Sequence, residues 1–297
     1  MIKLFPKISV TGDLGSGKSA VCKLLEQQTG FPIVSTGGIQ REIASKHGMT
    51  TLELNKYTET HPEIDDEIDG RISQLGKDER SIIFDSRLAW HFAPETFKIY
   101  LLADTDIAAT RIFNDTRTSE SYKSVREAKQ KILDRRTSEL NRFKSYYDID
   151  YSDMSNYDLV VETTTATPEE VAGTIISQFN LWKNGKPYNV FWLSPSSLLP
   201  TANISTLLSD APKPETEAGL GQALLLSLGR SFIIAGNHLV VSKAINEGKH
   251  LLPVFVFKPE AGKTGKLKIL SLARKNAVKE WEQHHKIKFS ELPDIFS

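Results

Sequence analysis

The chain has 297 residues, a length that favours two domains. Its 37 basic residues balance its 37 acidic residues, so no large net field would attract nucleic acid or an anionic membrane. A single cysteine, Cys22, excludes an intramolecular disulfide framework and is typical of a reducing compartment.

The N-terminus does not have the pattern of a secretory leader. Lys3, Pro6 and Lys7 interrupt its apolar residues, and no later apolar run is long enough to span a membrane. Cys22 falls inside a helical pattern, where packing is expected rather than reactivity. We therefore expect a cytoplasmic protein without a membrane partner.

The first part of the chain, up to about residue 182, alternates short apolar strands with helical patterns. Such alternation predicts an α/β fold in which helices cover a parallel, five-stranded sheet. The sequence Thr167-Pro168-Glu169-Glu170 predicts a helix start, with an N-cap, a proline in the first turn and a capping box. The five strand candidates are 8–11, 33–35, 81–85, 98–102 and 158–162.

Residues 12–19 form a glycine-rich loop between the first strand and the first helix, with the pattern G-x-x-x-x-G-K-S. In that setting backbone N–H groups and a helix N-terminus cradle phosphate oxygens. Lys18 is expected to reach the β- and γ-phosphates, and Ser19 to ligate Mg²⁺. The loop predicts a nucleoside triphosphate site built from Gly12, Asp13, Leu14, Gly15, Ser16, Gly17, Lys18 and Ser19.

Four arginines are placed where they could neutralise a second phosphate. Arg41 begins the helix after the second strand, and Arg87 follows the third strand. Arg135 and Arg142 flank Glu139 with a spacing that puts all three on one face of a helix. Each arginine alone could be a solvated surface residue, but several at one sheet edge indicate a site for phosphoryl transfer.

These segments together resemble the cytidylate kinases, in particular their short archaeal-type branch. The resemblance covers about residues 6–180. Its specific segments are "STGGIQREIASKHGM", "NKYTETHPEIDDEIDGRI", "FDSRLA" and "RRTSELNRFKSYYDID", with the loop and "YDLVVETTTATPEEV" beside them. It implies a nucleoside-monophosphate kinase fold that transfers a phosphoryl group from ATP to CMP or dCMP.

The resemblance also implies roles for individual residues. Asp85 would hold Mg²⁺ through water, together with Ser19. Lys18, Arg87, Arg135 and Arg142 would carry the catalysis. The CMP site would be formed by Ser35, Arg41, Arg87, Arg135, Glu139 and Arg142.

Two positions depart from the family pattern. Ser86 stands where relatives usually have glycine, and the arginine expected near Asp115 has only Arg117 as a nearby substitute. Arg117 begins a polar segment, 117–127, that is suited to closing over ATP and excluding water. The departures keep an alternative open, namely a regulator that binds ATP and CMP but turns them over slowly.

An acidic cluster follows the second predicted helix, and two interpretations of it remain. One of its carboxylates could hold the amino group of cytosine, but a solvated helix face is the favoured interpretation. The cluster consists of Glu63, Asp65, Asp66, Glu67 and Asp69.

The pattern breaks at "NGKPYN", which divides the chain into predicted domains 1–184 and 185–297. The second domain shows strand candidates at 189–193, 231–235 and 253–257, and it resembles a degenerate ParB- and sulfiredoxin-like domain. The turn Gly236-Asn237-His238 is expected at a helix N-terminus, where Gly236 and His238 could bind an anion. Ala235 and Leu239 replace the acid and the arginine of the family signature, so the resemblance implies the fold without the full chemistry. We expect an accessory role for this domain, regulatory or nucleotide-binding. We expect a monomer or weak dimer.

Overall fold

The computed structural model describes residues 5–50, 53–54, 57, 61, 63–115, 122–209, 221–257 and 275–289. The chain divides into two compact units, Met1–Tyr188 and Asn189–Ser297. The division falls close to the predicted boundary after residue 184. Whether each unit folds alone stays a prediction.

The first unit contains the parallel five-stranded sheet that the sequence predicts. Its strands have the order β2-β3-β1-β4-β5, and all four neighbouring pairs are parallel. The central strand is buried on both sides, with Ile8 and Val10 fully inaccessible. The strands are β1 (Ile8–Gly12), β2 (Ile33–Ser35), β3 (Ile83–Asp85), β4 (Phe97–Leu102) and β5 (Leu159–Glu162).

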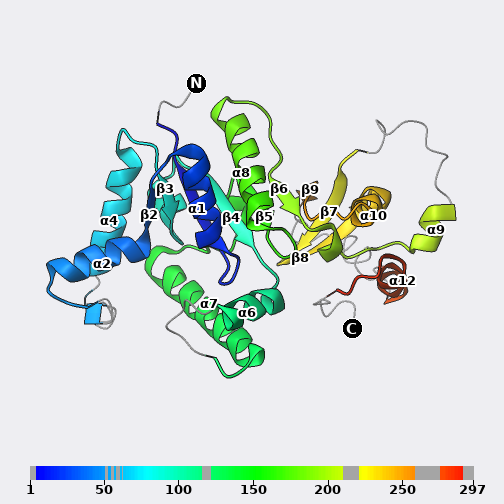
Figure 1. Cartoon of the computed structure of the whole chain (residues 1–297), viewed down its shortest axis with the longest axis horizontal. Coiled ribbons are helices and arrows are strands. Elements are labelled where there is room, and N and C mark those ends of the chain that lie inside the picture. Colours follow the sequence, from blue (N-terminus) through cyan, green and yellow to red (C-terminus); the bar gives the residue numbers. More distant parts are fainter. Residues whose placement is uncertain are drawn as a thin grey trace. The chain divides into compact units, whose positions relative to one another are not determined.

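Helices flank this sheet, and two of them carry the predicted local signals. In α1 Cys22 is buried, as expected for a packing role. In α8 Thr167 forms the capping box with Glu170, and α8 packs against α1 (Figure 1). The helices of the first unit are α1 (Lys18–Thr29), α2 (Thr36–Lys46), α4 (Glu63–Lys77), α5 (Ala89–Phe92), α6 (Thr105–Asn114), α7 (Val125–Tyr147) and α8 (Pro168–Lys183).

Helix α4 is amphipathic, and its apolar side packs with α2 in one core cluster. The buried positions Ile64, Ile68, Ile72 and Leu75 recur at helical spacing. The acidic residues lie on the remaining faces of α4. Helix α7, the longest helix described, carries the predicted arginine face.

The second unit has a mixed sheet in the order β6-β9-β7-β8, in which β7 and β9 are parallel and the other two pairs are antiparallel. Strand β7 was missed from the sequence because its run "ALLLSL" has no polar alternation. The elements of the second unit are β6 (Phe191–Leu193), α9 (Ile204–Ser209), β7 (Ala223–Leu228), β8 (Ser231–Gly236), α10 (His238–Asn246), β9 (Leu252–Phe257) and α12 (Lys275–His285).

Among the helices that the structure describes, none combines the length and the apolar character needed to cross a bilayer. The ParB-like kinship of the second unit stays a prediction.

Candidate active site

The glycine-rich loop joins β1 to α1 as the motif requires. Gly12 lies so close to β4 that a Cβ there would approach Leu101 to 2.7 Å, and Gly17 caps α1 with a φ of 78°. Both positions therefore need glycine. The hydroxyl of Ser16 is buried in this loop and has no hydrogen-bond partner among the described residues. A bound phosphate oxygen would satisfy it.

A cavity of about 800 Å³ opens on this loop and extends to α2, α4 and α7. Most of the predicted site residues line this one cavity. They are Asp13, Leu14, Gly15, Ser16, Gly17, Lys18, Ser19, Ser35, Asp85, Arg87, Arg135, Glu139 and Arg142. Gly12 is not among the lining residues, but its carbonyl accepts a hydrogen bond from Arg87.

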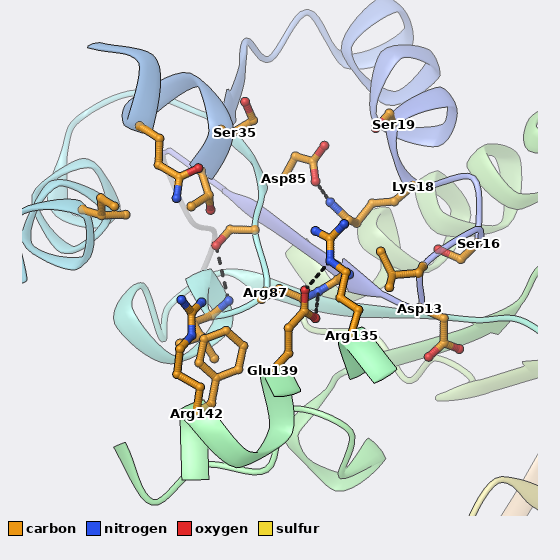
Figure 2. Close-up of a pocket in the computed structure, with 18 of the residues that line it drawn as sticks. Asp13, Ser16, Lys18, Ser19, Ser35, Asp85, Arg87, Arg135, Glu139 and Arg142 are labelled. Atoms are coloured by element: carbon orange, nitrogen blue, oxygen red, sulfur yellow. Dashed lines mark hydrogen bonds and ion pairs between the residues drawn. The ribbon is translucent and has the colours of Figure 1, made fainter. Parts of the chain in front are cut away.

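Lys18 and Asp85 form an ion pair inside the cavity, and Ser19 lines the cavity beside Lys18 (Figure 2). Burial and the neighbouring Arg87 lower the pKa of Lys18 to about 8. An incoming phosphate would favour the charged ammonium. The oxygen donors of Ser19 and Asp85 fit Mg²⁺, which prefers hard oxygen ligands and commonly takes one or two protein ligands beside substrate phosphates.

Glu139 bridges two of the arginines. Its carboxylate accepts hydrogen bonds from Arg87 Nε at 3.0 Å and Arg135 Nε at 3.1 Å (Figure 2). Burial would raise the pKa of Glu139, but the two guanidinium groups bring it below its ordinary value. The Tyr151 hydroxyl donates to the same carboxylate at 3.3 Å. Glu139 therefore orients Arg87 and Arg135. The sequence analysis had placed Glu139 only in contact with CMP.

Asp13 lines the cavity, yet its carboxylate is directed to β4 and away from Lys18 (Figure 2). Oδ1 accepts from the Tyr100 hydroxyl at 2.8 Å, and Oδ2 accepts from the Ala103 N–H at 2.9 Å. The side chain anchors the loop to the end of β4. Its contribution to phosphate binding would come from the backbone.

On the acceptor side, Ser35 caps α2 by accepting a hydrogen bond from the Gly38 N–H at 3.0 Å. The adjacent Thr36 lines the cavity, and its buried hydroxyl has no hydrogen-bond partner among the described residues. Arg41 is exposed and does not line the cavity. Its side chain nevertheless lies near Gly37, which does line it: Nη1 is 3.6 Å from the position that a Cβ on Gly37 would occupy. Contact of Ser35 and Arg41 with CMP stays a prediction.

The structure adds an arginine that the sequence analysis missed. Arg111 of α6 donates to the Thr163 carbonyl at 2.6 Å and lies 3.4 Å from the carbonyl of Gly15. It lines a second cavity of about 580 Å³ beside the loop. The sequence signal that could have identified Arg111 was its position four residues before Asp115, where relatives are expected to have an arginine. The substitute named from the sequence, Arg117, lies outside the described residues. The other departure, Ser86, is buried at the cavity wall, where its hydroxyl accepts from the Leu88 N–H.

In the second unit, α10 begins at His238 after a turn in which Asn237 has a φ of 59°. The Nε2 of His238 accepts from the Thr201 N–H at 3.3 Å, and its ring packs edge-on against Trp281. Burial lowers the pKa of His238 to about 4, so the ring is neutral at pH 7. Anion binding at Gly236 and His238 stays a prediction, and a neutral imidazole would contribute no charge to it.

Acidification should destabilise the second unit through His238. Because the pKa is about 4 in the fold and 6.5 in the reference state, the unfolded chain binds a proton first as the pH falls. The free energy of unfolding of the second unit is retained above about pH 6.5 and declines as the pH falls from 6.5 toward 4. His238→Asn should show a weaker decline between pH 7 and 5 in urea unfolding followed by tryptophan fluorescence.

The matched control for this experiment is His250→Asn, because His250 is exposed. An unchanged pH dependence in His238→Asn would contradict the assignment.

The strand order and the glycine-rich loop define a P-loop nucleotide-binding protein, and a cavity lined by this loop and by three arginines is suited to phosphoryl transfer. The sequence model of the cytidylate kinase-like family matches residues 7–165. The chain therefore belongs to the cytidylate kinase-like family.

The relatives of this chain include two cytidylate kinases and a nucleotide dehydratase. The chain is 35% identical to the cytidylate kinase of Methanobrevibacter smithii over 170 residues, which cover 57% of this chain and 96% of that protein. It is 37% identical to the cytidylate kinase of Haloarcula marismortui over 166 residues, 55% of this chain and 84% of that protein. It is also 34% identical to an S-adenosylmethionine-dependent nucleotide dehydratase of Lacinutrix mariniflava over 176 residues, 58% of this chain and 36% of that protein.

Proposed function

We propose that the first unit transfers the γ-phosphoryl group of ATP to CMP or dCMP. The observation that carries this proposal is the single cavity in which the P-loop lysine, Lys18, and the arginines Arg87, Arg135 and Arg142 meet. The cavity belongs to a chain of the cytidylate kinase-like family. The loop and its lysine suit a triphosphate, and the arginines suit a monophosphate beside it.

The donor would bind with its phosphates on the loop. Backbone N–H groups and the hydroxyl of Ser16 would hold the phosphate oxygens, and Lys18 would neutralise the transferred group. The second cavity adjoins the loop at Gly15 and Gly17 and would accommodate the donor base and ribose. Arg111 fixes the shape of this cavity by holding the Gly15 and Thr163 carbonyls.

Ser19 and Asp85 would hold Mg²⁺, the first directly and the second through water. When bound, the ion neutralises charge on the donor phosphates. Lys18 and Asp85 form an ion pair, so the lysine would lie beside a metal ion held by Asp85. Both cations would then act on the same phosphates.

The acceptor phosphate would be held by Arg87, just after β3, and by the arginines of α7. Glu139 keeps the Arg87 and Arg135 side chains in fixed orientations, so less conformational entropy is lost when phosphate binds. Phosphoryl transfer depends mainly on positioning and charge neutralisation, and this arrangement provides both. The alternative of a regulator with little turnover is not favoured, because the charged groups are present and oriented.

The second unit is proposed to be an accessory element, with a regulatory or nucleotide-binding role. All of the charged groups named above precede Tyr188, the last residue of the first unit. The chemistry is therefore assigned to the first unit alone.

An acceptor panel tests the proposed function. Full-length protein, ATP and Mg²⁺ are incubated with CMP, dCMP, UMP, AMP, GMP or dTMP, and release of ADP is followed. CMP or dCMP should give the largest kcat/KM, because the cavity belongs to a cytidylate kinase-like chain. A larger kcat/KM for AMP, GMP or dTMP would contradict the proposal.

A further inference from the structure

One face of α4 forms a wall of the main cavity. Asp65, Ile68, Asp69 and Ile72 line it, and their spacing of three and four residues places them on adjacent turns. Asp66 is exposed and does not line the cavity. The acidic cluster is therefore divided: two of its carboxylates contribute to the cavity wall, which corrects the interpretation of a purely solvated face.

Helix α7 supplies the neighbouring part of the wall with aromatic side chains. Phe143, Tyr146 and Tyr147 line the cavity together with the aliphatic Ile68 and Ile72 of α4. Aromatic and aliphatic surfaces of this kind suit the faces of a planar base. This end of the cavity offers apolar walls with a small number of polar groups, as small-molecule sites usually do.

This end lies at a distance from the phosphate groups that suits a mononucleotide. Glu139, which orients the arginines, precedes Tyr147 by eight positions on the same helix. A rise of 1.5 Å per residue separates them by about 12 Å along the axis. A monophosphate held by Arg87 and Arg135 would therefore extend its base toward Tyr147 and α4.

Asp69 is the carboxylate that is oriented within this end. Its Oδ2 accepts a hydrogen bond of 2.6 Å from the Tyr147 hydroxyl, whereas Oδ1 has no hydrogen-bond partner among the described residues. Burial raises the pKa of Asp69 to about 6, with Tyr147 and Arg142 opposing the rise and Asp65 and Asp66 adding to it. At pH 7.5 the group is mainly an acceptor with one fixed oxygen and one available oxygen.

The edge of a pyrimidine base distinguishes cytosine from uracil at one position. Cytosine carries a 4-amino donor, for which Asp and Glu carboxylates are suitable acceptors. Uracil carries an oxygen acceptor at that position, and a carboxylate would face it with no hydrogen between them. An oriented carboxylate thus accepts the first base and disfavours the second.

We propose that Asp69 is the residue that selects cytosine over uracil, by accepting a hydrogen bond from the 4-amino group through Oδ1 while Tyr147 holds Oδ2. This inference rests on the proposed CMP kinase function. It adds a specificity-determining residue on α4 to the proposed phosphate-binding groups, which are Arg87 and the arginines of α7.

The test measures kcat/KM for CMP and for UMP with full-length wild type, Asp69→Asn and the matched control Asp66→Asn. An asparagine amide can accept from cytosine or donate to uracil. The kcat/KM ratio of CMP to UMP should therefore fall at least about tenfold in Asp69→Asn, within the range that one base-edge contact controls. The KM for ATP should stay within about twofold, and Asp66→Asn should keep the wild-type ratio.

Two outcomes separate this inference from the proposed function. Wild type that phosphorylates neither CMP nor dCMP would refute the proposed function itself. Active wild type with the same CMP to UMP ratio in Asp69→Asn would overturn the role of Asp69 alone. If Asp69→Asn does not fold, as judged by a thermal melt, Tyr147→Phe is measured instead. This variant keeps the aromatic ring but removes the hydrogen bond that orients the Asp69 carboxylate, so the kcat/KM ratio of CMP to UMP should fall severalfold. An unchanged ratio would again overturn the role of Asp69.

Discussion

Replacing Lys18 with alanine should lower kcat for CMP phosphorylation at least about a hundredfold, the scale of one lost transition-state stabiliser. Lys18 is the ammonium of the P-loop, and it lies in the cavity beside Asp85. Without it, charge on the transferred phosphoryl group is left uncompensated. The fold should persist, because the removed side chain faces the cavity and leaves the core intact.

The measurement is ADP release under saturating ATP and CMP, with far-ultraviolet circular dichroism as the check on folding. Lys23→Ala is the matched control, because Lys23 is an exposed lysine of the same helix. It should retain wild-type turnover. Activity of Lys18→Ala within a factor of a few would show that the loop does not act in catalysis.

Arg87→Ala should reduce kcat/KM for CMP by about a hundredfold or more and should raise the KM for CMP far more than that for ATP. Arg87 is half-buried just after β3, where Nη1 donates to the Gly12 carbonyl and Nε donates to Glu139. Its loss removes a cation from the acceptor side. It also leaves Glu139 with Arg135 as its remaining arginine partner.

Breaking a buried ion pair costs stability as well as activity, so the kinetics need a folded variant. Arg87→Lys keeps the charge without the planar fork and should show an intermediate loss. Arg80→Ala, which removes an exposed arginine paired with Asp78, is the matched control and should behave as wild type. A rise in the KM for ATP with an unchanged KM for CMP would place Arg87 on the donor side.

The sequence was sufficient to predict the sheet and the loop because their signals are local. Strand β2 has the predicted bounds, and the other four strands of the first unit differ from prediction only at their ends. The spacing of Arg135, Glu139 and Arg142 placed them on one face of α7, and all three line the cavity. Helical periodicity carries that information within one segment.

Contacts between distant segments could not be predicted in this way. Asp69 and Tyr147 are separated by 78 positions, and their hydrogen bond depends on how α4 packs beside α7. Arg111 reaches the Gly15 carbonyl across 96 positions. Nothing in the local pattern of either residue indicates its partner, so their roles emerged only from the fold.

Side-chain direction was a further limit. Asp13 falls within the phosphate-binding motif, but its carboxylate anchors the loop to Tyr100 of β4. Similarly, the turn before α10 was predicted, whereas the packing of His238 against Thr201 and Trp281 was not. A motif identifies the backbone path more reliably than the partner of each side chain.

The most direct test of the proposed function is to identify the products formed from CMP and ATP. Full-length protein is incubated with both nucleotides and Mg²⁺, and the nucleotides are separated by anion-exchange chromatography. CDP and ADP should appear in equal amounts, and neither should form with Lys18→Ala. The same reaction is run in parallel with dCMP. Formation of ADP with neither CDP nor dCDP would contradict the proposed function.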